Sequence, residues 1–213
     1  MKPYFIKTSK IISDVIYPSL HWNVPATGKE LYITFDDGPS PGVTEQVLTI
    51  LKQHDAQATF FLIADKVKAY PELFQQLKEE GHATGNHTFH HLKGWNTPDE
   101  EYFQDIREAD QLIKSPLFRP PYGKISRKQL LHLKEKYSIV MWDLLSGDFD
   151  QKLSPESCYA NISQKASPGS IIVFHDSEKA APRMLYALPR FLEEYKEQGY
   201  TFRKITPEIL KKD

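Results

Sequence analysis

Residues 31–39 read LYITFDDGP, and this stretch decides how the rest of the chain is interpreted. The apolar run at 31–35 predicts a buried β-strand, because strands covered on both faces read as near-continuous hydrophobic runs. Two carboxylates, Asp36 and Asp37, follow it directly, and Gly38 and Pro39 then turn the chain away. An acidic pair of this kind can be a solvated turn, but the buried strand before it favours a site at the mouth of a sheet.

The alternation of apolar runs with helix-like stretches continues to the C-terminus. Further strands are expected at residues 58–63, 138–142, 170–174 and 200–203. Helices are expected at residues 44–54, 71–80, 97–114, 126–137, 154–166 and 182–198. Residues 97–100 (TPDE) predict a capping box at the start of one helix, and Pro189 predicts a break or kink in the last. The alternation predicts an α/β fold in which helices cover a parallel sheet or barrel.

The side chains suited to chemistry follow the strands of this pattern. They are Asp36, Asp37, His87, His91, Arg119, Asp148 and His175. In α/β barrels the loops at the carboxyl ends of the strands gather on one face and build the site. Residues that are far apart in the sequence are therefore expected to meet.

Residues 86–91 read NHTFHH and offer histidines at the spacing of metal ligands. On a helical turn His87 and His91 would share one face, with about 5–6 Å between their Cβ atoms. His87 with His90 is the alternative pair, and ordinary surface or core packing is the simpler interpretation. Together with Asp37, two histidines make a usual set for zinc or another divalent ion that keeps a coordination position open.

Two further stretches have candidate roles. In residues 119–123 (RPPYG), two prolines fix an extended backbone, so Arg119 and Tyr122 are expected to project from a rigid loop. An ordinary turn with a surface arginine is the alternative. His175 follows the apolar run at 170–174 and can be a satisfied core group or a general acid or base, because its pKa is near neutral.

The composition is that of a soluble globular protein of one domain, with 40% hydrophobic and 26% charged residues among 213. A formal net charge of −1 removes the main electrostatic argument for binding nucleic acid or an anionic membrane. The single cysteine, Cys158, excludes an internal disulfide. Lysines and Asp14 interrupt the apolar stretch in residues 1–18, so we expect a packed N-terminal helix rather than a signal peptide, a transmembrane segment or a membrane-surface anchor.

The ordered stretches TFDDGP, NHTFHH, RPPYG, WDLLSGDFD and IVFHD resemble the five motifs of the polysaccharide deacetylase family (carbohydrate esterase family 4, the NodB-homology domain). The resemblance runs from about residue 31 to about residue 205. It implies a single α/β domain, a distorted and partly open (β/α) barrel with about seven parallel strands. Residues 31–213 would form the catalytic domain, and residues 1–30 an extension packed on the barrel.

The resemblance also implies roles for the metal side of the site. Asp36 would be the catalytic base, and Asp37, His87 and His91 would bind a divalent metal, expected to be Zn²⁺ with Co²⁺, Ni²⁺ or Mn²⁺ as alternatives. His90 falls on a variable position of the motif, so we expect it to support the site or to face solvent.

On the substrate side, His175 would be the general acid, and Asp148 would tune it or brace the arginine. Arg119 would pair with Asp36 and hold it ionised. Tyr122 would give its backbone N–H to the oxyanion, and Phe149 with Val173 would line the acetyl pocket. The fourth motif departs from the family pattern, because Leu145 and Phe149 stand where an aspartate and a tryptophan are usual. From the residues themselves, Trp95 is the best candidate for a sugar platform and packing is its alternative.

The expected function is metal-dependent removal of N-acetyl groups from a glycan that contains N-acetylglucosamine, such as chitin oligomers or a peptidoglycan-type glycan. An O-acetyl esterase of the acetylxylan type and an amide hydrolase acting outside glycans are alternatives, and an inactive glycan-binding domain is an alternative of another class. A glycan substrate, no nucleic-acid partner and a monomer are expected. The absence of a clear signal peptide favours a cytoplasmic or non-classically placed bacterial protein.

Overall fold

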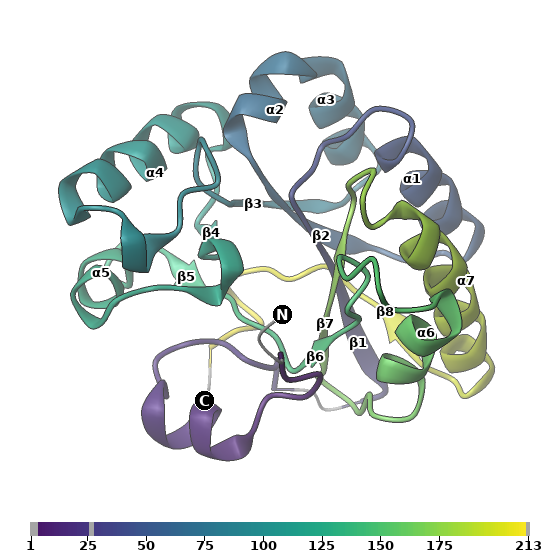
Figure 1. Cartoon of the computed structure of the whole chain (residues 1–213). Coiled ribbons are helices and arrows are strands. Elements are labelled where there is room, and N and C mark those ends of the chain that lie inside the picture. Colours follow the sequence, from purple (N-terminus) through teal and green to yellow (C-terminus); the bar gives the residue numbers. More distant parts are fainter. Residues whose placement is uncertain (1–3, 26–27, 212–213) are drawn as a thin grey trace.

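Strand β1 (Glu30–Asp36) lies at the centre of the sheet in the computed structural model, which describes residues 4–25 and 28–211 (Figure 1). All but its first residue are buried, as the apolar run predicted. It pairs in parallel with β2 and β7 on its two sides. The register places Asp36 opposite Phe61 of β2 and opposite His175 of β7.

The sheet continues outward from β1 in the order β5-β4-β3-β2-β1-β7-β6, and β8 pairs with β1 off this path. All of these pairings are parallel. The path of seven strands curls into a half-barrel, so the predicted partly open barrel is confirmed. The other strands are β2 (Ala58–Leu62), β3 (Ala83–Asn86), β4 (Leu117–Phe118), β5 (Ser138–Ile139), β6 (Leu144–Leu145), β7 (Ile171–His175) and β8 (Thr201–Phe202).

Helices cover the outer side of the curled sheet (Figure 1). Helix α1 shows why they pack there, since its buried residues Val47, Leu48 and Leu51 recur at helical spacing. In the core, the Phe35 ring stacks on the rings of Phe60 and Phe174 at 4.9 and 6.0 Å. The helices are α1 (Thr44–Gln53), α2 (Ala64–Ala69), α3 (Pro71–Glu79), α4 (Asp99–Ile113), α5 (Arg127–Leu133), α6 (Pro155–Ser163) and α7 (Ala181–Glu197), with short turns η2 (Gly94–Asn96) and η3 (Pro121–Gly123).

Two helix expectations are wrong in detail. Helix α7 continues through Pro189 without a break. The proline removes one backbone hydrogen bond, but Leu188 and Phe191 are fully buried around it, and this packing keeps the helix continuous. Helix α4 begins at Asp99 without a side-chain cap, because the N-cap position falls on Pro98, which has no polar side chain, and the Thr97 hydroxyl donates to the Lys93 carbonyl.

The expectation of a single strand at residues 138–142 is also wrong. The strand β5 ends at Ile139, and the chain bends before it forms the next short strand, β6. Arg119 explains the bend. Its Nε donates to the Val140 carbonyl at 3.1 Å and its Nη2 to the Met141 carbonyl at 2.9 Å. A buried guanidinium thus takes hydrogen-bond acceptors that a neighbouring strand would otherwise use.

The N-terminal segment (residues 4–25) lies against the sheet near β6 and β7. Lys7 forms an antiparallel bridge with Leu144, and Asn23 forms one with Ser170. The packed N-terminal helix expected from the sequence is wrong, because the chain between these contacts forms only the π-helical turn η1 (Ile11–Ile16), which contributes no buried residue. Among the described residues, no helix is both long enough and apolar enough to cross a membrane.

Candidate active site

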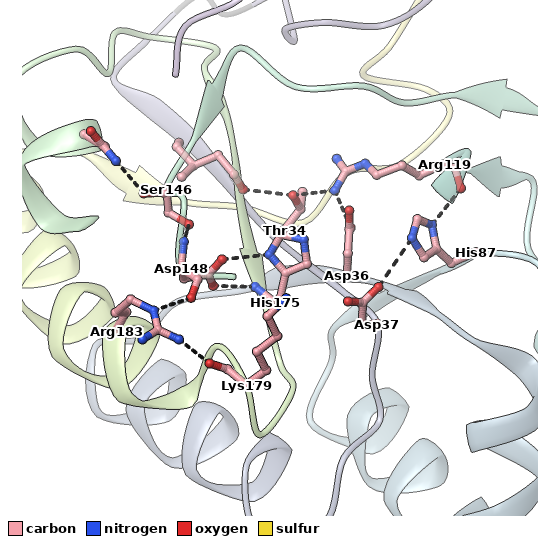
Figure 2. A network of polar contacts seen from close by, with 12 residues as sticks. Thr34, Asp36, Asp37, His87, Arg119, Ser146, Asp148, His175, Lys179 and Arg183 are labelled. Carbon is pink, nitrogen blue, oxygen red and sulfur yellow. Dashed lines mark hydrogen bonds and ion pairs between the residues drawn. The ribbon is translucent and has the colours of Figure 1, made fainter. Parts of the chain in front are cut away.

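The carboxyl ends of parallel strands bring together polar residues that the sequence singled out (Figure 2). Asp36 is the last residue of β1, and His175 is the last residue of β7. His87 directly follows β3, and Arg119 directly follows β4. Asp148 lies in the loop after β6 and contacts His175. These neighbouring strand ends therefore form one connected site.

Asp37, His87 and His91 form a group that could hold a metal ion. Their ligand atoms all lie within 4.8 Å of one another. Asp37 Oδ1 lies 3.1 Å from His91 Nε2 and 3.7 Å from His87 Nε2. Two imidazoles and one carboxylate are a common donor set for zinc and related divalent ions.

The two histidines meet without the helical turn that their spacing suggested. Residues 87–91 form a loop, in which Thr88 and His91 have φ angles of 67° and 57°. The Asn86 side-chain oxygen accepts a hydrogen bond from the Thr88 N–H at 2.8 Å and stabilises this bend. The centres of the His87 and His91 rings nevertheless lie 5.1 Å apart. The expected proximity is present, but a left-handed loop conformation produces it.

Asp105 on α4 holds the middle of the histidine loop. Its Oδ2 accepts hydrogen bonds from the N–H groups of Phe89 and His90 at 2.7 and 3.1 Å. Its Oδ1 lies 2.5 Å from His90 Nδ1. His90 is therefore engaged by α4, and the geometry favours His91 over His90 as the companion of His87.

The protonation states of this group suit a divalent cation. His87 Nδ1 lies 2.7 Å from the Arg119 carbonyl, which can only accept, so Nδ1 carries the proton and Nε2 keeps its lone pair. Burial lowers the pKa of His87 to about 4, so its ring is neutral at pH 7. Burial alone would raise the pKa of Asp37, but the His91 hydrogen bond and the charge of His175 lower it overall. A neutral imidazole and an ionised carboxylate fit a bound metal.

Asp36 is held by a fully buried arginine. Arg119 Nη1 lies 2.6 Å from Asp36 Oδ1 and also donates to the Thr34 hydroxyl at 2.8 Å. Arg119 has no exposed surface, and Asp36 is 4% exposed. With its other nitrogens on backbone carbonyls, the guanidinium is fixed in place, and it fixes the Asp36 carboxylate in turn.

His175 is paired with a second buried carboxylate. Its Nδ1 lies 2.7 Å from Asp148 Oδ1, and its backbone N–H donates to Asp148 Oδ2 at 2.7 Å. Arg183 Nε donates to the Asp148 carbonyl at 2.6 Å and holds the loop from α7. Burial alone would lower the pKa of His175, but the charge and hydrogen bond of Asp148 outweigh it and raise that pKa to about 9. His175 is therefore an imidazolium at neutral pH.

The residues predicted for the acyl pocket lie beside His175. The Phe149 ring meets the His175 ring edge-on at 5.2 Å. Val173 is two residues before His175 on β7, so both side chains point to the same face of the sheet, and Val173 is 1% exposed. Leu145 is buried in β6, where it pairs with Val173.

Tyr122 and Trp95 form an exposed rim next to the histidine loop. They are 59% and 55% exposed, and the Tyr122 ring lies 4.7 Å from the His91 ring. Tyr122 has a φ angle of 60°, a left-handed conformation that is uncommon for residues other than glycine. The Trp95 indole N–H donates to the Ile125 carbonyl at 2.7 Å, and the Lys124 ammonium lies 4.2 Å from its ring. The orientation of Trp95 is thereby fixed.

Several supporting residues were not predicted from the sequence. Thr34 is the polar residue inside a buried strand, and Asp105 is buried on the apolar face of α4, so polarity in an apolar pattern was the available signal. Asp176 has no exposed surface, and the Thr44 hydroxyl donates to its Oδ2 at 2.7 Å. Burial raises the pKa of Asp176 to about 7. Its place directly after His175 was the only sign of it.

Comparison with known proteins gives a consistent result. The family model described as "Polysaccharide deacetylase" matches residues 23–138. A peptidoglycan-N-acetylglucosamine deacetylase of Bacillus cereus is 39% identical over 188 residues, which cover 85% of this chain and 88% of that protein. A chitooligosaccharide deacetylase of Azorhizobium caulinodans is 39% identical over 155 residues, covering 68% of this chain and 73% of the relative.

The fold is also that of a solved structure. A peptidoglycan N-acetylglucosamine deacetylase superposes with a TM-score of 0.87 at 27% sequence identity, and the alignment covers 97% of this chain and 99% of the other. Because the alignment covers nearly the full length of both chains, the likeness extends to the N-terminal segment.

Proposed function

The chain belongs to the polysaccharide deacetylase family, as its five sequence motifs predicted, and we propose that it removes N-acetyl groups from glycans that contain N-acetylglucosamine. The observation that supports this most strongly is the pair Asp36 and His175. A carboxylate held by Arg119 and an imidazolium held by Asp148 end adjacent strands, next to the Asp37–His87–His91 group. Amide hydrolysis needs a base, an acid and a means of stabilising an oxyanion.

Asp37, His87 and His91 would hold a divalent metal ion, for which Zn²⁺ is the first candidate. When bound, the ion supplies Lewis-acid polarisation of a carbonyl and makes water more acidic. These three residues would provide one carboxylate oxygen and two imidazole nitrogens to the ion.

Asp36 acts as the general base in this proposal. Its Oδ1 is occupied by Arg119 at 2.6 Å, so Oδ2 is the oxygen that can take a proton from the attacking water. The arginine holds the carboxylate in one orientation. Because Asp36 is 4% exposed, bulk water competes little for this oxygen.

His175 acts as the general acid. Asp148 engages Nδ1, which leaves the Nε2 proton for the departing nitrogen. A pKa of about 9 keeps this proton in place at neutral pH. Tyr122 would add a backbone N–H to the oxyanion, and Phe149 with Val173 would enclose the acetyl methyl group.

A protonated acid beside the site favours an amide over an ester as the substrate. An amine must be protonated to leave, whereas an ester oxygen leaves with less help. Relatives that are named as N-acetylglucosamine and chitooligosaccharide deacetylases support the same choice. Both chitin-type and peptidoglycan-type glycans therefore belong in the test.

The test is acetate release by the zinc-loaded protein from N-acetylglucosamine oligomers, a peptidoglycan fragment and acetylated xylan. We expect release from the first two, its loss on chelation and its recovery with Zn²⁺. The variant Asp36→Asn is the control for contaminating activity. Release from acetylated xylan alone would contradict the amide assignment, and no release from any substrate by the metal-loaded protein would support a glycan-binding role.

A further inference from the structure

The N-terminal segment covers the outer edge of β6. Lys7 bridges Leu144 in antiparallel orientation, and the Leu145 N–H donates to the Ile6 carbonyl at 2.8 Å. On its other side β6 pairs with β7, which carries His175. The segment therefore runs beside the strand from which the Asp148 loop departs.

This course places Tyr4 against that loop. The centre of the Tyr4 ring lies 5.0 Å from the centre of the Phe149 ring, and the two planes are tilted by 57°. Phe149 in turn meets His175 edge-on at 5.2 Å. A row of three rings thus connects the N-terminal segment with the candidate acid.

The Tyr4 hydroxyl anchors the ring at the same loop. It donates to Asp150 Oδ2 at 3.2 Å, and a Cβ atom added at Gly147 would lie only 2.9 Å from it. Burial, with the charge of Asp150, raises the pKa of Tyr4 to about 12, so the hydroxyl remains a donor at any working pH. Tyr4 therefore contacts the turn on both sides of Asp148.

The other supports of the loop act on its backbone. Asn161 Nδ2 donates to the Ser146 carbonyl at 2.8 Å, and Arg183 Nε donates to the Asp148 carbonyl at 2.6 Å. Tyr4 differs from both because it contacts the Phe149 ring itself. Phe149 is half-buried, so its position depends on the side chains on its two faces.

We propose that Tyr4 is a positioning residue of the acyl pocket, which holds Phe149 against His175 and so limits the size of the acyl group that the site accepts. This rests on the proposed function, in which Phe149 and Val173 enclose the acetyl methyl group. Tyr4 touches no substrate and acts through Phe149. Without the Tyr4 ring, Phe149 can move away from His175, and the pocket gains room for a longer acyl chain.

The test compares kcat/KM for the N-acetyl and N-propionyl forms of one N-acetylglucosamine-type oligomer. For Tyr4→Ala we expect the propionyl-to-acetyl ratio to rise about tenfold, the low end of the discrimination that one methylene gives in an apolar pocket. Tyr4→Phe keeps the ring and should keep the wild-type ratio. Phe5→Ala is the matched control, because the neighbouring Phe5 is 77% exposed.

An unchanged ratio in Tyr4→Ala overturns the proposal, as does an equal loss of activity on both acyl forms, which would make Tyr4 a support of the fold alone. If Tyr4→Ala does not fold, as judged by circular dichroism, Tyr4→Leu replaces it. That variant fills part of the space without the ring and should raise the ratio, and a wild-type ratio would overturn the proposal. Failure of the proposed function is seen separately, as no acetate release by the wild-type protein.

Discussion

Asp36 and His175 are register partners at the ends of the adjacent parallel strands β1 and β7. The pairing of two buried strands therefore sets the relative position of the two groups proposed as base and acid. A slip of one residue would turn either side chain to the opposite face of the sheet. Full burial of Phe35 and Phe174, the residues just before them, opposes such a slip.

The first prediction concerns the proposed metal ligands. His91→Ala should lower the bound zinc content, measured by metal analysis after dialysis, because His91 Nε2 lies in the Asp37–His87–His91 group. His90→Ala is the matched control and should retain zinc, because His90 Nδ1 contacts Asp105 instead. Full zinc in His91→Ala together with loss in His90→Ala would reverse the assignment.

A second prediction concerns pH. Asp148 raises the pKa of His175 to about 9, and the rate should fall as pH rises through that pKa and the acid loses its proton. Asp148→Asn removes the negative charge, so the alkaline limb of kcat/KM should move to lower pH by about one to three units. A bound cation lowers the pKa in both proteins, so the difference between them is the quantity to measure.

The exposed Asp65 provides the control for this experiment. Asp65→Asn should leave the alkaline limb where it is in the wild-type protein. An unmoved limb in Asp148→Asn would show that another group titrates there.

A third prediction concerns stability. Arg119→Met should lower the free energy of unfolding by about 3–5 kcal/mol, because it leaves the Asp36 carboxylate buried without its partner. Adding Asp36→Asn removes that charge and should restore part of the loss. Urea unfolding of both variants measures this. A double variant no more stable than Arg119→Met would show that lost packing of the arginine, and not the unpaired carboxylate, causes the loss.

Sequence reasoning reached the strand-helix alternation and the candidate site residues because both leave local patterns. The run at 31–35 predicted β1 by its continuous apolarity, and the polar residues after strands predicted one shared site. Arg119 shows the limit of such reasoning. Its guanidinium binds the carbonyls of Val140 and Met141 and bends the chain between β5 and β6. A local sequence pattern cannot predict such a contact, because the partners lie about 20 residues apart in the chain.

The histidine loop shows a different limit. The spacing of His87 and His91 suggested a helical turn, but Asn86 and Asp105 hold the loop in a left-handed conformation instead. Tyr4 could not be foreseen either, because its contact with Phe149 depends on how the N-terminal segment lies along β6. Local reasoning finds residues of suitable chemistry, whereas contacts between distant segments decide their geometry.

A fourth prediction concerns the rim. Trp95→Ala should raise KM for long N-acetylglucosamine oligomers and leave kcat nearly unchanged, because a sugar ring resting on the indole would be bound equally before and during the reaction. The effect should be smaller for a short oligomer that does not reach the rim. If Trp95→Ala has the wild-type KM for both the long and the short oligomer, Trp95 has only a packing role against Lys124.

The division of labour between Asp36 and His175 is tested most directly by the leaving group. The measurement is the rate of His175→Ala and Asp36→Asn, relative to wild type, on an N-acetylglucosamine oligomer and on an activated aryl acetate ester. His175→Ala should lose at least about 10²-fold on the amide and little on the ester, whose phenolate leaves without a proton, while Asp36→Asn should lose activity on both. An equal loss on amide and ester in His175→Ala would contradict the assignment of His175 as the acid.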